Sequence, residues 1–327
     1  MGSLIDALGS KLRRMAFSVE GESQVPVELA PLFERLSGIY GPDVLPQIRA
    51  TLIEPKRLAW LVNPLRPAER LPDGEPVPAL SGCFALPPQH RALLMTHPAV
   101  EAGSAYPANP SSVVAARALN VRPGQEVLDL AAAPGGKTLQ VAAAMGNRGR
   151  IAAVEAVKGR FHRMRANLNR CGVTIAEFYL ADGRSIGRKV PERFDRVLLD
   201  SPCSSESRIR LDDPVSYQHW STRKTKEMAR KQRGLIRSAY LALKPGVEMI
   251  YCTCAFSAEE NELVVDYLLS REPGAELLEP EVSAANTIRG LTSWRGKPLD
   301  PRLSRCRRIL PDDLFDGFFV ARICKGG

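Results

Sequence analysis

The sequence has few of the residues that build disulfide frameworks, zinc sites or membrane spans. Its 327 residues include 7 cysteines, an odd number with no Cys-x-x-Cys pair, and 4 scattered histidines. This pattern predicts free thiols and no bound metal. No apolar run approaches the roughly 20 residues that cross a membrane, and the first residues, MGSLIDALGSKLRRM, lack the apolar stretch of a secretory signal. We therefore expect a cytoplasmic protein that does not bind membranes.

The chain also has fewer acidic than basic residues. The chain has 45 Lys and Arg residues against 36 Asp and Glu residues, which gives a net charge of +9 at pH 7. Excess positive charge favours a polyanionic partner such as nucleic acid, although it does not indicate a fold. Hydrophobic residues make up 44% and charged residues 25% of the chain, a composition that is typical of a globular protein.

The pattern of apolar residues divides the chain into three parts. Residues 1–26 form a basic segment and a linker, and residues 27–105 a small α+β domain in which Gly41 and Pro42 separate two helices. Residues 106–327 alternate strands with helices, which predicts an α/β fold with a Rossmann-like, doubly wound parallel sheet. Ligands bind such sheets beyond the carboxyl ends of the strands.

Six strands and two helices of this third part are predicted most clearly. The strands span residues 126–132, 149–156, 175–182, 194–202, 247–253 and 316–324. The helices span residues 221–243 and 257–271, and the second has Ser257 and Glu260 at the spacing of a capping box.

The glycine-rich stretch LDLAAAPGGKT joins the first of these strands to a helix. It is not a P-loop, because Ala131 stands where the first glycine would be, and the dinucleotide fingerprint Gly-x-Gly-x-x-Gly is absent. Small side chains and helix N-terminal amides suit the carboxylate of a nucleoside–amino acid cofactor such as S-adenosylmethionine. Acids end the next three strands, at Glu155, Asp182 and Asp200, where the first two can bind ribose hydroxyls and adenine. Together these features predict a nucleoside cofactor at this edge.

Two cysteines follow the ends of two strands predicted to be neighbours. Cys203 lies in the loop after Asp200, and Cys254 follows the strand at residues 247–253. A thiolate that adds to carbon 6 of a pyrimidine makes carbon 5 nucleophilic, and a carboxyl group near ring nitrogen 3 can stabilise the adduct. Cys252 lies two residues before Cys254, so spacing alone does not choose between them, and a redox pair is the alternative. Buried space-filling is the expected role of the remaining cysteines, Cys83, Cys171, Cys306 and Cys324.

Three motifs together resemble those of the RsmB/RsmF (Nop/Sun-type) family of S-adenosylmethionine-dependent RNA cytosine-5 methyltransferases. LDLAAAPGGKT is similar to the family's cofactor signature D-x-C-A-A-P-G-G-K-T, LLDSPCSS to its D-x-P-C-S-G motif, and YCTCAFSAEENE to its S-T-C-S-x-x-x-x-E-N-E motif. FERLSGIYG, LAWLVNPL and RRILPDDLFDGFFVARI are similar to other family segments, so the resemblance covers about residues 27–325. It implies a class I methyltransferase fold preceded by a small RNA-binding domain.

The resemblance also implies roles for particular residues. Cys254 matches the nucleophile, Cys203 the second cysteine that assists product release, and Asp200 the carboxylate that contacts the target cytosine beside the cofactor. The residues that match the cofactor loop are Ala131, Ala132, Ala133, Pro134, Gly135, Gly136 and Lys137. Glu155 and Asp182 match the ribose and adenine contacts, and Arg160 matches a basic residue on the cofactor side.

Five positions depart from the family pattern. Ala131 stands for cysteine, Glu155 for aspartate, Ser205 for glycine, Ala255 for serine, and Cys252 occupies a position that is usually serine. None of these changes removes a required group, so we expect activity.

Basic residues gather in two segments that we expect to contact RNA phosphates. They are Arg223, Lys224, Lys226, Arg230, Lys231, Arg233 and Arg237 in the long helix, and Arg302, Arg305, Arg307 and Arg308 near the end. Tyr217, His219 and Trp220 are candidates for stacking on a base, and Trp220 is equally a candidate for the core.

These observations predict an RNA (cytosine-5) methyltransferase, a monomer that transfers a methyl group from S-adenosylmethionine to a cytosine in ribosomal or transfer RNA. Two alternatives stay open. One is a DNA cytosine-5 methyltransferase, a class that uses the Pro-Cys thiol as nucleophile. The other is a non-catalytic RNA-binding protein of the same fold.

Overall fold

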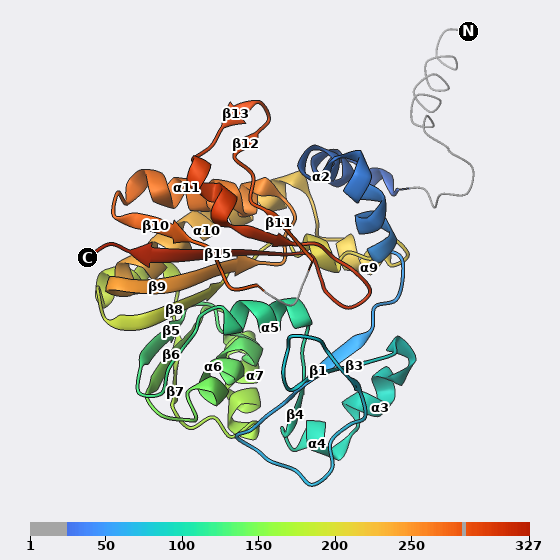
Figure 1. The fold of residues 1–327 in the computed structure, drawn as a ribbon, viewed down its shortest axis with the longest axis vertical. Coiled ribbons are helices and arrows are strands. Elements are labelled where there is room, and N and C mark those ends of the chain that lie inside the picture. The colour runs from blue at the N-terminus through green and yellow to red at the C-terminus, as the bar shows by residue number, and fades with distance from the viewer. Residues whose placement is uncertain (1–24, 283–285) are drawn as a thin grey trace.

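The computed structural model describes residues 25–282 and 286–327, so predictions for residues 1–24 lie outside the described residues. The helices are α2 (Ala30–Thr51), α3 (Arg91–Met95), α4 (Pro98–Glu101), α5 (Pro110–Arg117), α6 (Gly136–Ala144), α7 (Lys158–Arg170), α8 (Ile186–Lys189), α9 (Pro214–Tyr217), α10 (Thr222–Ala242) and α11 (Glu262–Arg271). The 3-10 turns used below are η3 (Gly183–Ser185), η4 (Glu206–Arg208) and η5 (Ala258–Glu260). Figure 1 shows how these elements are arranged.

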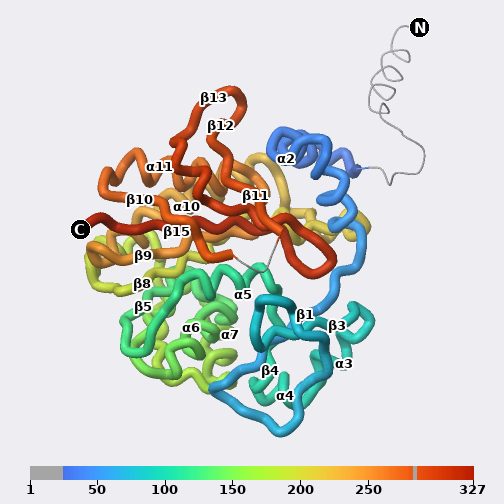
Figure 2. The backbone as a smooth tube through the Cα atoms, viewed as in Figure 1, coloured from blue at the N-terminus to red at the C-terminus, as the bar shows by residue number. Residues whose placement is uncertain are grey.

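The strands form two main sheets, and Figure 2 follows the chain through them. The first strands are β1 (Leu58–Val62), β2 (Glu75–Pro76), β3 (Cys83–Leu86) and β4 (Ala105–Pro107). The next are β5 (Glu126–Asp129), β6 (Arg150–Glu155), β7 (Ala176–Leu180), β8 (Phe194–Asp200) and β9 (Leu243–Thr253). The last are β10 (Ala275–Leu278), β11 (Thr287–Arg289), β12 (Ser293–Trp294), β13 (Lys297–Pro298), β14 (Arg307–Ile309) and β15 (Phe318–Lys325).

The large sheet contains five adjacent parallel strands, as the alternation of strands and helices predicts. Its order is β11-β14-β15-β9-β8-β5-β6-β7, and β9, β8, β5, β6 and β7 run parallel to their neighbours. β15 joins antiparallel to β9, with Phe319 opposite Thr253, and β10 pairs with β15. Because the chain order reverses between β5 and β8, the carboxyl ends of these strands form the crevice where such sheets bind ligands.

Helices cover both faces of this sheet. α5, α6 and α7 lie on one face, and α10 and α11 lie on the other (Figure 1). Side chains of β9 alternate between the two cores, since Ile250 and Cys252 pack with the first set of helices, and Met249 and Tyr251 with the second. The central strands are buried on both faces, which explains their nearly continuous apolar sequences.

Residues 27–105 contact the large sheet and its helices in two places. α2 bends at Gly41, whose φ of 69° confirms the predicted break, and it packs against a core that includes Phe256 and Leu310. The small sheet, in the order β2-β3-β1-β4, instead packs against the side of α5 and α6, where Leu61 shares a core with Val113. The two parts therefore lie on either side of the carboxyl edge of the large sheet, as Figure 1 also shows.

The C-terminal arginines serve the fold, so the prediction that this group contacts phosphates is wrong for Arg308. Its guanidinium is 1% exposed, forms an ion pair with the buried Glu262, and donates to the carbonyl of Phe256 at 2.7 Å and the hydroxyl of Tyr40 at 3.2 Å. Arg302, Arg305 and Arg307 are also engaged, with Asp300, the carbonyl of Leu277 and Glu279. Arg308 thus joins α2, α11 and the end of β9 through a single buried charge.

The predicted capping box at Ser257 and Glu260 is also wrong. The segment opens with η5, α11 begins only at Glu262, and neither turn has a side-chain cap. Ser257 Oγ donates to Glu206 and Glu260 accepts hydrogen bonds from Ser204, so tertiary partners replace the local ones.

The described residues can be compared with what a disulfide, a metal site or a membrane-spanning helix requires. All seven cysteines are free; Cys83, Cys171 and Cys306 are buried as predicted, and Cys324 is half-buried. Within residues 25–282 and 286–327 no cluster of His, Cys, Asp and Glu is suited to a metal ion. Among the helices of this part of the chain, none has the length and apolar character to cross a bilayer.

Replacing Arg308 by alanine should destabilise the protein by about 3–5 kcal/mol, because Glu262 would then be a buried charge without its partner. Urea unfolding measures the change. Arg289→Ala, an exposed arginine in the adjacent strand β11, is the control and should change the free energy of unfolding by no more than about 0.5 kcal/mol. Equal effects of the two substitutions would contradict the structural role assigned to Arg308.

Candidate active site

The structure brings Cys203 and Cys254 into contact at the carboxyl edge of the sheet. β8 and β9 are parallel neighbours with Asp200 opposite Cys252, so the loops that follow them lie side by side. The sulfur atoms of Cys203 and Cys254 are 3.2 Å apart. Cys254 is 9% exposed and Cys203 is half-buried, so the pair lies under the surface but remains reachable from it.

The two thiols differ in acidity. The hydrogen bond from Cys203 lowers the pKa of Cys254 to about 7 against the effect of burial, and the guanidinium of Arg208 acts in the same direction. The same hydrogen bond, together with burial, raises the pKa of Cys203 well above that of an ordinary thiol. These opposite shifts favour Cys254 as the thiolate of the pair and Cys203 as the proton donor.

Asp200 forms an ion pair next to the two thiols. Its Oδ2 lies 2.7 Å from Lys137 Nζ, which also donates to Ser112 Oγ at 2.9 Å. Burial opposes the charge of the ammonium, but the carboxylate of Asp200 outweighs this effect and raises the pKa of Lys137. Lys137 thus holds the carboxylate at the end of β8 facing the glycine-rich loop.

The extra thiol of Cys252 supports Asp200. Cys252 is fully buried, and its Sγ donates to Asp200 Oδ1 at 3.6 Å. Burial raises its pKa well above the ordinary thiol value, so it remains a neutral donor. Cys252 therefore has a structural partner in Asp200, and Cys254 stays the predicted nucleophile.

A pocket of about 170 Å³ opens between the glycine-rich loop and this ion pair. It is lined by Tyr106, Pro107, Ala108, Asn109, Ser112, Asp129, Ala131, Ala132, Ala133, Pro134, Gly136, Lys137, Gln140, Asp200 and Arg208. Tyr106 and its neighbours come from β4 and the segment after it, so the small sheet helps to form the site. The pocket is smaller than the roughly 300–1,000 Å³ that enclose drug-sized ligands, so it matches one end of such a ligand.

Asp129 lines this pocket with a carboxylate of which one oxygen has no hydrogen-bond partner among the described residues. Its Oδ2 accepts a hydrogen bond from Thr138 Oγ1 at 2.7 Å, whereas Oδ1 is buried and has no hydrogen-bond partner in the described part of the chain. Burial raises the pKa of Asp129 to about 7. An ammonium group bound in the pocket would supply the missing donor and favour the ionised carboxylate. The sequence places Asp129 in the glycine-rich motif but gives no sign of this unsatisfied oxygen.

Glu155 and Arg160 lie next to the same loop. Glu155 is buried at the end of β6, where Oε1 accepts from the backbone of Val157 at 2.8 Å and Oε2 lies 3.7 Å from Arg160 Nε. Arg160 also donates to the carbonyl of Ala133 at 2.7 Å, which ties α7 to the glycine-rich loop. Neither residue lines the 170 Å³ pocket.

Asp182 is placed differently from the other predicted acids. Its carboxylate is exposed and bound by the side chain of Arg184, with distances of 2.6–3.0 Å. It lines a separate pocket between α8 and α10 rather than the pocket beside Asp200. The guanidinium of Arg184 lowers the pKa of Asp182.

Two buried carboxylates hold the cysteine loops in place, and sequence reasoning missed both roles. Glu206 is fully buried; its carboxylate accepts from the backbone N–H groups of Phe256 at 2.9 Å and Ser257 at 2.8 Å, and from Trp220 Nε1 at 3.1 Å. It thereby fastens the loop after Cys203 to the segment after Cys254. Trp220 is half-buried by this contact, so it supports the loop, whereas His219 is exposed.

Glu260 forms the second link between these loops. It accepts from the backbone N–H of Ser204 and from Gln232 Nε2, both at 2.9 Å, and its pKa is raised by burial to about 8. Between these anchors, Ser205 has a φ of 58°, a left-handed conformation that glycine adopts more readily. In this position Ser205 Oγ lies 3.7 Å from the sulfur of Cys254.

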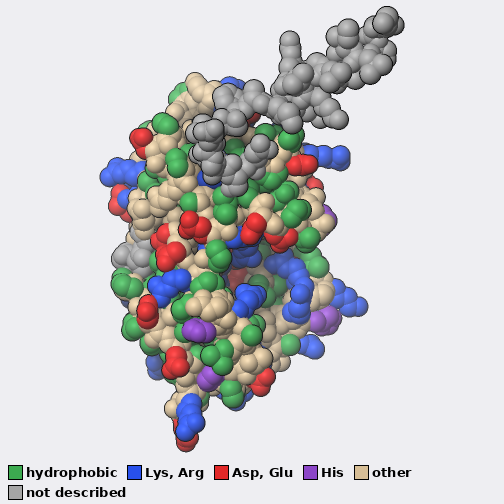
Figure 3. Space-filling model, turned by 90° about the vertical axis from the view of Figure 1, so that its right-hand side faces the viewer, with side chains coloured by type: hydrophobic (Ala, Val, Ile, Leu, Met, Phe, Trp, Pro, Cys, Tyr) green, Lys and Arg blue, Asp and Glu red, His purple; other side chains and the backbone are tan. Residues whose placement is uncertain are grey.

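The pocket opens onto a surface rich in positive charge. Through Arg208 it continues into a recess of about 430 Å³ that contains Lys56 and Arg210, and on its other side into one of about 280 Å³ that contains Arg57 and Arg91. Figure 3 shows this face, on which Lys and Arg side chains lie beside and below a central hollow and Asp and Glu side chains lie along its upper rim.

The sequence is similar to known methyltransferases over most of its length. Residues 116–324 match the model of the family described as 16S rRNA methyltransferase RsmB/F. Two similar curated proteins, each named Ribosomal RNA small subunit methyltransferase F, come from Klebsiella pneumoniae (38% identical over 258 residues) and Erwinia tasmaniensis (42% over 203 residues). These alignments cover 79% and 62% of this chain but 48% and 40% of the relatives, so the chain spans less than half of their length.

Two solved structures share the fold. A methyltransferase homolog protein from Pyrococcus horikoshii is 28% identical, with a TM-score of 0.76, and the match covers 98% of this chain and 99% of that one. NSun6 from Pyrococcus horikoshii with SFG has a TM-score of 0.70, with 92% and 98% covered, and its 22% identity shows the fold alone.

The acidity of Cys254 predicts a pH-dependent reactivity. Because its pKa is lowered to about 7, the thiolate is present above that pH and is lost as the pH falls below it. Alkylation of Cys254 by iodoacetamide, followed by peptide mass spectrometry, should reach half its maximal rate near pH 7. Cys203→Ala removes the hydrogen-bond donor and should move this midpoint towards the ordinary value of about 8.5. A midpoint near 8.5 in the unmodified protein would contradict the assignment.

Proposed function

This chain belongs to the 16S rRNA methyltransferase RsmB/F family, and from that premise we propose that it is an RNA (cytosine-5) methyltransferase that modifies ribosomal RNA and uses S-adenosylmethionine. The observation that carries the proposal is the polarised thiol pair beside the Asp200–Lys137 ion pair. One thiolate, one thiol and one carboxylate are the groups that chemistry at carbon 5 of cytosine requires.

The residues of the glycine-rich loop fit the amino-acid end of the cofactor. The unpaired Oδ1 of Asp129 suits an ammonium group, and the backbone at the start of α6 suits a carboxylate. Glu155 is the candidate for the ribose hydroxyls, with Arg160 holding the carboxylate in place. When bound, the cofactor supplies a methyl group on a sulfonium, an electrophile that a neutral cytosine attacks poorly. Asp182 remains a candidate adenine contact only if its carboxylate turns away from Arg184.

Cys254 provides the nucleophile in the proposed mechanism. Its thiolate bonds to carbon 6 of the target cytosine, which gives carbon 5 the electron density of an enamine. Asp200, held by Lys137 and Cys252, is the candidate partner of ring nitrogen 3, and a proton taken from solvent and held between the two would neutralise the charge that the addition puts on that nitrogen. The base must leave its stack to reach the buried thiols, so an unpaired or flipped cytosine is the substrate.

Cys203 changes its role as the reaction proceeds. While Cys254 is an anion, its charge and hydrogen bond keep Cys203 protonated. Once Cys254 is bonded to carbon 6, that negative charge is gone and the main cause of the raised pKa disappears. Cys203 can then release its proton to solvent, accept the proton from carbon 5, and allow the sulfur of Cys254 to leave as a thiolate.

The acidity order of the two thiols distinguishes this proposal from a DNA cytosine-5 methyltransferase. That class uses the Pro-Cys thiol, which is Cys203 in this chain, as the nucleophile. Here Cys203 has the raised pKa and Cys254 the lowered one, which favours Cys254. A non-catalytic RNA-binding protein would need neither the polarised pair nor the unsatisfied oxygen of Asp129.

Two substitutions test the mechanism. Cys254→Ser should reduce methylation of 16S ribosomal RNA by S-adenosylmethionine to background, because a serine hydroxyl does not ionise near neutral pH. Cys203→Ala should form the bond to RNA but release it slowly, so a protein–RNA adduct should persist in denaturing electrophoresis. Methyl transfer from labelled cofactor and gel mobility are the measurements.

Calorimetry with S-adenosylmethionine is the control. Both variants should bind the cofactor with the same affinity as the unmodified chain. Full turnover by Cys254→Ser would overturn the proposed mechanism. Absence of cofactor binding by the unmodified chain would favour the non-catalytic alternative.

A further inference from the structure

The exposed face of α10 carries a continuous stripe of positive charge. Arg223, Lys226, Arg230, Arg233 and Arg237 follow one another at intervals of three and four residues, which places them on one side of the helix. All five are exposed, whereas Thr225, Met228, Gln232, Ile236 and Ala239 face the core. The 14 residue steps from Arg223 to Arg237 make the stripe about 21 Å long.

Most of the charge on this stripe is not neutralised by the protein. α10 contains seven basic residues and a single acid, Glu227, which pairs with Lys224 and Lys231 on another side of the helix. Among the described residues, Arg223, Lys226 and Arg230 have no acidic partner within ion-pair distance, and Arg237 pairs with Glu272. Such a stripe on a folded surface lacks the counter-charges that a structural role would provide.

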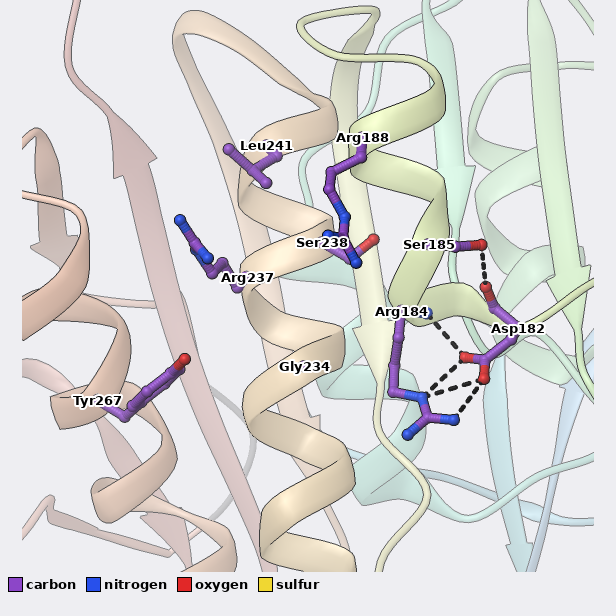
Figure 4. A pocket seen from close by; sticks show the side chains of 9 residues that line it. All are labelled: Asp182, Arg184, Ser185, Arg188, Gly234, Arg237, Ser238, Leu241 and Tyr267. Atoms are coloured by element: carbon purple, nitrogen blue, oxygen red, sulfur yellow. Dashed lines mark hydrogen bonds and ion pairs between the residues drawn. The ribbon is translucent and has the colours of Figure 1, made fainter.

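A pocket of about 670 Å³ lies along the last turns of α10 and extends the stripe. In Figure 4, Arg188 extends from α8 towards α10, the guanidinium of Arg184 is turned to Asp182, and Arg237 projects from α10 on the side of Tyr267. Arg184 is held by Asp182, whereas Arg188 has no acidic partner in the described part of the chain. Of the three guanidinium groups that line this pocket, Arg184 pairs with Asp182 and Arg237 with Glu272, so Arg188 is the one left to bind an anion in the described part of the chain.

An aromatic ring completes this surface. Tyr267 of α11 lies under the guanidinium groups of Arg233 and Arg271, at 5.5 and 5.8 Å from the ring centroid. Arginines spread over an aromatic ring present flat faces on which a nucleobase can stack. The combination of phosphate-binding cations and a stacking platform favours a nucleic acid over an acidic protein.

α10 packs against the loop that carries Cys203. Gln232, on the buried face of α10, donates to the carbonyl of Pro202, and the first turn of α10 follows Trp220, which binds the Glu206 anchor. The stripe lies on the opposite, exposed face of the same helix. An RNA whose target base enters the site would reach the stripe by passing round α10.

We propose that the α10 stripe and the adjoining arginine pocket form a second RNA-binding surface, which holds the sugar–phosphate backbone several nucleotides away from the methylated cytosine. The inference rests on the proposed function, because it identifies where the same substrate extends beyond the site. The 21 Å length corresponds to about six nucleotides of a helical strand, at roughly 3.4 Å per nucleotide. The surface reads no base sequence; it adds affinity for long or structured RNA.

The test compares two double variants of the same helix with the same loss of charge. Arg223→Gln with Arg230→Gln removes two residues of the stripe, and Lys224→Gln with Lys231→Gln removes two cations from another side of α10. Fluorescence anisotropy measures binding, at several salt concentrations, of a 16S ribosomal RNA transcript and of a short single-stranded oligonucleotide with one cytosine. Thermal unfolding checks that both variants fold.

The stripe variant should bind the transcript on the order of tenfold more weakly at 0.1 M salt, and its slope of log affinity against log salt should be shallower by about 1.4–1.8. The Lys224/Lys231 variant should retain the slope of the unmodified protein, and the short oligonucleotide should bind all three proteins equally. Equal slopes for the two variants, with RNA binding by the unmodified chain intact, would overturn this inference alone. An unmodified chain that binds neither RNA would overturn the proposed function and the inference with it.

Discussion

The site at the carboxyl edge of the sheet depends on one contact, the 3.2 Å approach of the sulfur atoms of Cys203 and Cys254. At that distance the hydrogen bond from one thiol lowers the pKa of the other, and the guanidinium of Arg208 acts in the same direction. The contact exists only because β8 and β9 are adjacent and parallel, and because the loops after them are held by Glu206 and Glu260. Burying a carboxyl group costs free energy, and the several hydrogen bonds that each of these two acids accepts offset that cost.

The rest of the molecule surrounds this contact with fixed charges. Lys137 from the glycine-rich loop and Cys252 from β9 hold the two oxygens of Asp200, and Arg208 adds positive charge above Cys254. Tyr106 from the small sheet closes the pocket on the far side, and Arg308 ties α2 to the segment that follows Cys254. Residues 27–105 therefore contribute directly to the site, in two separate places.

Periodicity and motif spacing predict the fold well, because parallel strands buried on both faces have a distinctive apolar pattern. The strand ends at Glu155 and Asp200 agree with the structure, and so does the break at Gly41. Contacts between distant segments are not visible in the same way. Ser257 and Glu260 match a local capping pattern, yet each bonds to the loop after Cys203, and Arg308 resembles a surface arginine but is buried with Glu262. The predicted strand end at Asp182 is wrong by two residues, because β7 ends at Leu180 and Asp182 caps the turn that follows. The neighbouring Arg184 binds the carboxylate of Asp182, and an alternating strand pattern does not predict that contact.

The most direct test of the account is to trap the bond between protein and base. In RNA that contains 5-fluorocytosine, carbon 5 carries fluorine in place of the proton that must leave, so elimination stops and the sulfur remains on carbon 6. Incubation with S-adenosylmethionine, digestion and peptide mass spectrometry then identify the attached residue. The expected product is an RNA-linked peptide modified at Cys254. Attachment through Cys203, or turnover of cytosine-containing RNA with no adduct on the fluorinated RNA, would contradict it.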